Sequence, residues 1–88
     1  MSDQNTLGRL RFRSWHRGTR EMDLLMGSFA DAHLGRFTPD QILQYEALLQ
    51  ISDPDLYNWI TGGEQVPANL NNDVMRLLCA HRYAEKLD

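Results

Sequence analysis

Arg17-Gly18-Thr19-Arg20-Glu21 is the stretch around which we expect the chain to fold. Glycine adopts positive φ without steric cost, so Gly18, placed between an arginine-rich segment and an apolar one, predicts a sharp turn that joins two helices. Arg17 and Glu21 are four residues apart in the order that opposes the helix dipole, and pairing within one helix would contribute only about 0.2–0.5 kcal/mol. If a helix restarts at Gly18 or Thr19, Glu21 lies in its first turn, where a carboxylate is favoured by about 0.3–1 kcal/mol. The residues alone leave open whether this turn is a helix start or a contact surface.

Apolar residues recur at helical spacing in five segments on both sides of this turn. We expect helices at about residues 7–16, 19–34, 39–51, 54–60 and 68–85. The residues expected to face the core are Leu7, Leu10, Ser14, Met22, Leu25, Met26, Phe29, Ile42, Tyr45, Leu48, Leu49, Leu56, Trp59, Ile60, Leu70, Val74, Leu77, Leu78 and His81. No stretch alternates with period two over more than a few residues, and no hairpin signal is present. The sequence therefore predicts an all-α protein, a compact five-helix bundle with a single domain over residues 1–88 and flexible ends at 1–6 and 86–88.

Turn and cap residues mark the expected helix boundaries. Gly35 is expected to stop the second helix. Thr38 is the expected N-cap of the third helix, and Gln41 follows at the position that completes a capping box. Asp53 is the expected cap of the fourth helix, which Gly62 then ends.

Composition places the chain among ordinary folded proteins. It has 88 residues, of which 42% are apolar and 24% charged, which suffices for one modest core. Cys79 is the single cysteine and cannot form an internal disulfide, and the chain opens without an apolar signal region or an arginine-rich transit segment. No apolar run approaches the roughly 20 residues that span a bilayer. We therefore expect a cytoplasmic protein that does not insert into membranes and that acts as a monomer.

Charge is distributed unevenly along the chain. Residues 9–20 contain five arginines and no acidic residue, whereas the remainder carries four basic and twelve acidic residues. On a helix Arg9, Arg13 and Arg17 would lie within about 80° of arc. Such an arginine edge is either a solvated face or a surface that recognises carboxylates, phosphates or aromatic rings.

Residues capable of catalysis or metal binding do not form a recognisable pattern. Cys79 and His81 diverge by about 200° on a helix, and neither His16 nor His33 has a partner at ligand spacing, so no zinc site is expected. Cys79 is expected to be a structural buried thiol, and His81 to lie at the edge of the core. No glycine-rich nucleotide loop and no nucleophile motif occur. We expect that the protein is not an enzyme.

Two separated segments carry a family resemblance. Residues 12–25, Phe-Arg-Ser-Trp-His-Arg-Gly-Thr-Arg-Glu-Met-Asp-Leu-Leu, and residues 53–62, Asp-Pro-Asp-Leu-Tyr-Asn-Trp-Ile-Thr-Gly, resemble the small flavinylation-factor family of succinate dehydrogenase, which has bacterial cytoplasmic and mitochondrial matrix members. The resemblance implies a five-helix assembly factor that binds the flavoprotein subunit of succinate dehydrogenase, and often that of fumarate reductase. It further implies that the factor promotes covalent attachment of FAD to a histidine of that subunit. The factor itself would bind no cofactor stably, and the FAD of its client would be involved only indirectly.

The family's functional motif falls on the turn. The residues that the resemblance assigns to the partner contact are Arg17, Gly18 and Glu21, flanked by Arg13, Trp15, His16, Arg20 and Asp23. Some bacterial members have an arginine and a methionine where this chain has His16 and Thr19. Trp15 could instead pack against the fourth helix. The second family segment, which begins at Asp53, is expected to be chiefly structural.

Three alternatives to the assembly-factor reading remain open at this point. One is an interaction module of another kind, similar to an antitoxin, with a different protein partner. Another is a weak nucleic-acid-binding helical domain that uses the arginine edge, against which the acidic remainder of the chain argues. The third is a protein that binds FAD in its own right, although no dinucleotide-binding fingerprint supports it.

Overall fold

A computed structural model of the chain describes residues 4–81. The α-helices in this range are α1 (Gln4–Trp15), α2 (Arg20–His33), α3 (Pro39–Leu48), α4 (Asp53–Ile60) and α5 (Asp73–Ala80), and the short 3₁₀ turns are η1 (Leu34–Arg36) and η2 (Ala68–Leu70). No strand occurs in the described part, so the predicted five-helix, all-α fold is confirmed. Within residues 4–81, no helix is both long enough and apolar enough to cross a bilayer.

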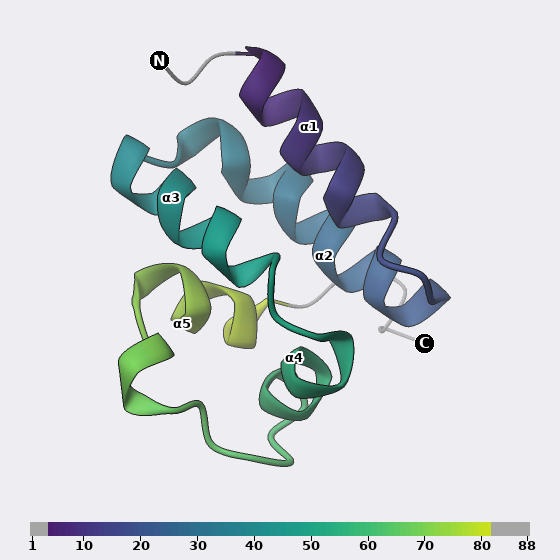
Figure 1. Ribbon diagram of the computed structural model, residues 1–88, viewed down its shortest axis with the longest axis vertical. Helices are drawn as coiled ribbons and strands as arrows, with labels where there is room; N and C mark the ends of the chain where they lie inside the picture. Colours follow the sequence, from purple (N-terminus) through teal and green to yellow (C-terminus); the bar gives the residue numbers. More distant parts are fainter. Residues whose placement is uncertain (1–3, 82–88) are drawn as a thin grey trace.

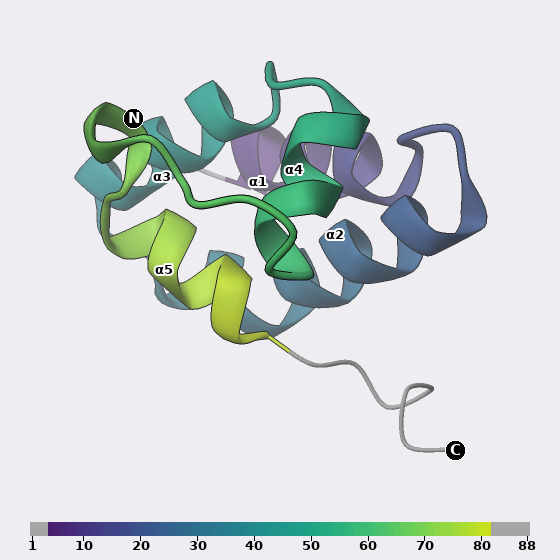
Figure 2. The ribbon, with the colours of Figure 1, turned by 90° about the horizontal axis from the view of Figure 1, so that it is seen from below.

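The helices form two groups that meet along α3. α1 and α2 run antiparallel side by side, joined by the turn at one end of the molecule (Figure 1). α4 and α5 lie together at the opposite side, where α5 packs against α3 (Figures 1 and 2). Because α3 touches the second group and follows directly from α2 through η1, it connects the two halves of the core.

One continuous core joins all five helices. Buried apolar residues from every helix contribute to it, and these are Leu10, Met22, Leu25, Met26, Phe29, Ala30, Leu34, Ile42, Tyr45, Leu48, Leu49, Leu56, Ile60, Val74, Met75 and Leu78. Leu7, Trp59 and Leu70 are partly buried against this cluster, as expected. Leu77 was expected in the core, but it is 38% exposed, and Met75 is buried in its place. Burial on α5 therefore centres on Val74, Met75 and Leu78.

Trp15 packs on α2, and the prediction that it could pack on the fourth helix is wrong. Gly27 makes this contact possible, because a Cβ atom at that position would lie 2.1 Å from the indole ring. The indole Nε1 also lies 3.5 Å from the carboxylate of Asp31. A larger residue at Gly27 would force the ring out and separate α1 from α2.

Local cap signals locate some helix ends well and others poorly. The capping box of Thr38 and Gln41 is present as predicted. Gly62 ends α4 with φ of +85°. Gly35 does not stop α2, because the chain continues past His33 into η1 without a positive φ at the glycine. Asp53 is not the cap of α4 either: Ser52 is the N-cap residue, and Asp53 is the first helical residue.

The ends of the first and last helices also differ from expectation. α1 begins at Gln4, three residues before the predicted start. α5 begins only at Asp73, because the side chain of Asn72 accepts a hydrogen bond from the amide of Met75 at 2.9 Å and caps the helix there. His81 leaves the helix with ψ of 140°. Residues 4–6, part of the end predicted to be flexible over residues 1–6, instead form the start of α1. The rest of the predicted last helix, up to residue 85, residues 1–3 of the predicted N-terminal end and the predicted flexible end at 86–88 lie outside the described residues.

A buried polar contact ties α1 to α3. The hydroxyl of Ser14 donates to the carbonyl of Leu10 at 2.7 Å and lies 2.6 Å from the hydroxyl of Tyr45. Since the hydrogen of Ser14 points to Leu10, the tyrosine donates to Ser14, and its hydroxyl also lies 3.5 Å from the carbonyl of Met26. Burial raises the pKa of Tyr45 to about 12, so this donor stays protonated. These contacts fix α1, α2 and α3 in position relative to one another.

This contact predicts an asymmetric double-mutant cycle. Ser14→Ala should cost about 1–3 kcal/mol of unfolding free energy, because it leaves a buried tyrosine hydroxyl without its close acceptor. Tyr45→Phe should cost only about 0.5–1.5 kcal/mol, because Ser14 keeps its bond to Leu10. In urea unfolding the double variant should match Tyr45→Phe alone. Additive losses in the double variant would mean that the two hydroxyls do not interact.

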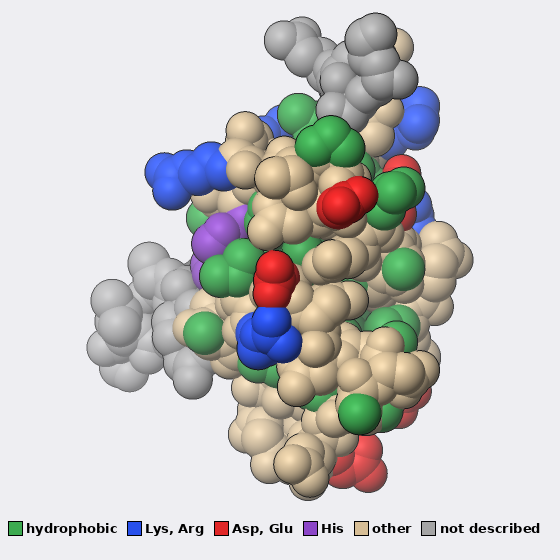
Figure 3. Space-filling model, turned by 90° about the vertical axis from the view of Figure 1, so that its left-hand side faces the viewer, with side chains coloured by type: hydrophobic (Ala, Val, Ile, Leu, Met, Phe, Trp, Pro, Cys, Tyr) green, Lys and Arg blue, Asp and Glu red, His purple; other side chains and the backbone are tan. Residues whose placement is uncertain are grey.

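A cluster of aromatic and imidazole rings lies between α2, η1 and the residue that follows α5. His33 packs on Phe29 with ring centroids 4.5 Å apart and faces His81 at 6.0 Å. The imidazole Nε2 of His81 is 2.8 Å from the hydroxyl of Ser28, so His81 lies at the edge of the core as expected. Figure 3 shows histidine side chains beside hydrophobic ones on the surface of the molecule. Burial, and secondarily the charge of Arg36, lower the pKa of His33 from its ordinary value of 6.5.

This lowered pKa sets the sign of a pH effect on stability. The unfolded chain takes up a proton at position 33 more readily than the folded chain, so the contribution of His33 is present above pH 6.5 and is lost as the pH falls through the folded pKa. The free energy of unfolding, measured in urea, should therefore fall between about pH 7.5 and about pH 5.5. His33→Gln should reduce this dependence of the unfolding free energy on pH. An unchanged slope in His33→Gln would assign the effect to other groups.

Candidate functional site

The turn between α1 and α2 is closed by hydrogen bonds to its own backbone. Gly18 has φ of +125°, a conformation that strains any other L-residue. Thr19 is the N-cap of α2, and its hydroxyl accepts from the amide of Met22 at 3.2 Å. The carboxylate of Asp23 accepts from the amides of Arg17 at 2.6 Å and Gly18 at 3.2 Å. Asp23 therefore holds the turn in shape and does not project from it.

Arg17 clamps this turn to the connection between α3 and α4. Its guanidinium donates to the carbonyls of Leu49 at 2.9 Å and Ile51 at 2.8 Å, and its Nε donates to the carboxylate of Asp53 at 2.8 Å. The Nη2 atom lies 2.6 Å from the same carboxylate, and the arginine side chain is only 11% exposed. A positive charge at the end of α3 and a negative charge at the start of α4 also suit the two helix dipoles. Arg17 is thus an internal clamp, and it does not continue the arginine edge of α1.

Glu21 is the exposed charge of the motif. It lies in the first turn of α2, as the sequence predicted for a helix that restarts at this point. Its side chain is exposed and makes no hydrogen bond or ion pair with any residue between 4 and 81, Arg17 included. Arg20 precedes it and is exposed as well. The turn therefore presents Glu21 to solvent on a framework that Arg17, Gly18 and Asp23 hold rigid.

The last turn of α1 and the residue that follows it add an exposed aromatic pair. Phe12 is 64% exposed, and its ring stacks on that of His16 with centroids 4.0 Å apart. The Nδ1 atom of His16 is 2.7 Å from the carbonyl of Phe12, which fixes the imidazole in place. A shallow groove of about 340 Å³ runs from this pair to the α3–α4 connection, past Arg13, Arg17 and Asp53.

The structure thus separates the predicted contact residues into two sets. Glu21, Arg20, Arg13 and His16 are exposed around the turn, whereas Arg17, Asp23 and Trp15 make contacts within the fold. The sequence analysis did not assign a site role to Phe12 or Asp53. Phe12 follows the arginines at helical spacing, which could have indicated an exposed aromatic, but nothing local reveals that Asp53 meets Arg17.

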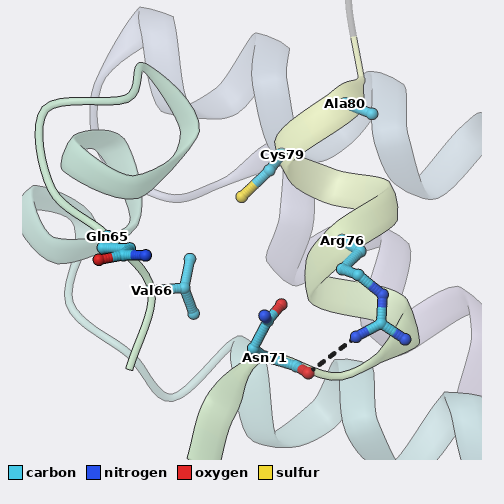
Figure 4. Close-up of a pocket in the computed structure, with 6 residues that line it drawn as sticks. All are labelled: Gln65, Val66, Asn71, Arg76, Cys79 and Ala80. Carbon is cyan, nitrogen blue, oxygen red and sulfur yellow. Dashed lines mark hydrogen bonds between the residues drawn. The ribbon is translucent and has the colours of Figure 1, made fainter. Parts of the chain in front are cut away.

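A different hollow, of about 410 Å³, lies between α5 and the segment that follows α4. Figure 4 shows the side chain of Cys79 pointing into it toward Val66, with Arg76 bonded to the carbonyl of Asn71 at its edge. The Sγ atom of Cys79 lies 3.8 Å from the carbonyl of Trp59, to which it donates. This thiol packs against the core as a structural residue, but it is only partly buried, so the expectation of a buried thiol is wrong. The hollow brings together no acid–base pair.

These features define a small all-α protein that exposes one charged turn, stiffened from within by a buried arginine. In residues 4–81, no group of three or more His, Cys, Asp or Glu side chains could hold a metal ion. Residues 8–82 match the family model described as flavinator of succinate dehydrogenase, and the chain belongs to that family.

Individual relatives agree with this membership. The mitochondrial succinate dehydrogenase assembly factor 2 of Dictyostelium discoideum is 40% identical over 73 residues, which are 83% of this chain and 52% of the relative. The FAD assembly factor SdhE of Acetobacter pasteurianus is 35% identical over 68 residues, 77% of this chain and 62% of the relative. The mitochondrial succinate dehydrogenase assembly factor 2-A of Drosophila yakuba is 39% identical over 75 residues, 83% of this chain and 46% of the relative. The chain thus matches between 46% and 62% of the length of these relatives.

Substitutions in the two sets of motif residues should change stability by different amounts. Arg17→Ala should lower the unfolding free energy by about 1.5–3 kcal/mol, because it removes hydrogen bonds to a carboxylate and leaves two carbonyls without their donor. Arg17→Lys should recover only part of this, since an ammonium cannot reproduce the planar fork. Glu21→Ala should change stability by less than about 1 kcal/mol, the value of a carboxylate in a first helical turn. Equal losses in Arg17→Ala and Glu21→Ala would mean that Glu21 is also a structural contact.

Proposed function

We propose that this chain is an assembly factor that binds the flavoprotein subunit of succinate dehydrogenase and promotes covalent attachment of FAD to it. Membership of the flavinator family and the names of its relatives support the proposal. The observation that carries it is Glu21, exposed and without a partner among residues 4–81, on a turn where Arg17 and Asp23 are bonded internally. A rigid turn with a free carboxylate is suited to bind a partner in one orientation.

In this proposal the protein contributes positioning and no catalytic group. The client subunit supplies the flavin and the histidine that receives it, and binding holds the attachment site in a productive arrangement. Glu21 pairs with a basic or amide group of the client, while Arg17 and Asp23 keep the turn in the bound shape beforehand. A preformed surface loses little conformational freedom on binding, so more of the contact energy remains for affinity.

We also propose an oligomeric state, a compartment, a mode of action on FAD and a second client for this protein. The protein acts as a monomer in the compartment where the flavoprotein subunit matures, without inserting into the membrane. It holds no FAD stably and affects the cofactor only through the client. The flavoprotein subunit of fumarate reductase is a second client.

Nucleic-acid binding is the weaker alternative. The predicted arginine edge of Arg9, Arg13 and Arg17 is reduced in the fold, because Arg17 is paired with Asp53. Phosphate binding would need several free cations along one face. A protein partner other than the flavoprotein, as in the antitoxin-like reading, would use the same turn and is distinguished by the experiment below.

A complementation experiment tests the proposal. Cells that lack this chain are supplied with the wild type, with Glu21→Ala, or with Glu64→Ala, which removes another exposed glutamate located far along the chain in the loop after α4. Covalent flavin fluorescence of the flavoprotein subunit is read after denaturing electrophoresis. We expect the wild type and Glu64→Ala to restore the band and Glu21→Ala to restore about a tenth of it or less, as for a central interface residue.

Two other outcomes would contradict the proposal in different ways. Equal fluorescence in all cells, including those without the chain, would show that flavinylation does not need this protein, and the antitoxin-like interaction would become the leading reading. If Glu21→Ala restored the full fluorescent band and only the cells without the chain lacked it, the assembly role would stand. Glu21 would then not be part of the contact.

A further inference from the structure

An exposed aromatic residue on α1 is the feature of this surface that the fold does not explain. Phe12 is 64% exposed although it belongs to a helix that buries Leu10 and Ser14 on its other face. Single exposed apolar residues are common, but Phe12 separates two hollows. One is the groove toward the α3–α4 connection, and the other, of about 400 Å³, lies along Asn5, Gly8 and Arg9. Phe12 and Arg13 line both hollows and form a ridge between them.

The ridge is held rigid before any partner arrives. The ring of Phe12 lies against His16 at 4.0 Å with the planes inclined by 23°, and His16 is anchored by its Nδ1 atom to the carbonyl of Phe12. Phe12 lies on the last turn of α1 and His16 directly follows the helix, at the start of the clamped turn. A stacked aromatic that is already ordered is the type of residue that acts as an interface anchor.

The charges around the ridge specify what it would bind. Arg9 and Arg13 are exposed and have no carboxylate partner among residues 4–81. Asp53, the carboxylate that lines the groove, is already neutralised by Arg17 at 2.6 Å. The surface is therefore positive beside an open aromatic ring, and it complements a chain segment that carries carboxylates next to an apolar side chain.

We propose that the ridge of Phe12 and Arg13, with Arg9 and His16, docks an acidic segment of the client flavoprotein. An apolar side chain of that segment lies on the Phe12 ring, and its carboxylates pair with Arg9 and Arg13. This inference rests on the proposed function, and it adds a second contact, of opposite charge, to the one made by Glu21. The two contacts lie on either side of the turn.

Binding of the purified flavoprotein subunit to the full chain tests the inference. Phe12→Ala and Arg13→Glu should each raise the dissociation constant by about tenfold or more. Matched controls are Leu43→Ala, which removes an apolar side chain that is 63% exposed on α3, and Arg36→Glu, which reverses an exposed arginine on η1. Both controls should bind within about twofold of the wild type. Raising the salt concentration should weaken the wild type more than Arg13→Glu, because the variant has lost an ion pair across the interface.

The chemistry of the bound segment is tested separately by photo-crosslinking. A photoreactive phenylalanine analogue in place of Phe12 should crosslink to a segment of the flavoprotein that is rich in Asp and Glu, as identified by mass spectrometry. A crosslink to a basic segment would overturn the inference. The inference would also be overturned if Phe12→Ala and Arg13→Glu both bound the flavoprotein with wild-type affinity while Glu21→Ala bound it weakly. That result would leave the proposed function intact. No binding by the wild-type chain would instead overturn the proposed function and this inference together.

Discussion

The guanidinium of Arg17 holds together two corners of the chain that lie more than thirty residues apart. The end of any helix leaves carbonyls without intrahelical partners, and the start of a helix favours negative charge. Arg17 satisfies two carbonyls after α3 and pairs with Asp53 at the start of α4. Because the side chain is 11% exposed, water competes weakly for these contacts. The placement of the Gly18 turn relative to α3 and α4 therefore depends on one side chain.

This arrangement divides the charged motif by the direction in which its residues point. Arg17 and Asp23 point inward, one toward the neighbouring corner and the other toward the turn amides. Glu21 lies between them in sequence and points to solvent. A substitution in the motif can therefore impair function in two physically different ways, by loosening the turn or by removing a contact. Stability and activity have to be measured on the same variant to distinguish them.

Some features set by neighbours in sequence were predicted correctly, whereas features set by distant contacts were missed. The capping box at Thr38 and the glycine turn at Gly18 follow from chemistry within three residues, and both are present. Asp53 has the local pattern of a helix cap, but Arg17 recruits it across the fold, and Ser52 becomes the cap residue. Trp15 was ambiguous because the space that receives it is created by the missing Cβ of Gly27 on another helix. Sequence reasoning thus predicted a contact site on the turn but could not tell which of its residues face outward.

An exposed positive charge on α1 and an exposed negative charge on α2 flank the turn, and their positions restrict how a partner can approach. Arg13 on α1 and Glu21 on α2 are both exposed, while Arg17 between them is held in the clamp. Complementary charges contribute more to orientation and association rate than to final affinity. Within the described residues, large apolar side chains with substantial exposure are few and lie on separate helices: Phe12, Leu43, Tyr57 and Leu77. Obligate interfaces are larger and more apolar than such a surface provides. A surface of this kind favours a partner that is aligned, held briefly and released, as the proposed assembly role would require once the client has matured.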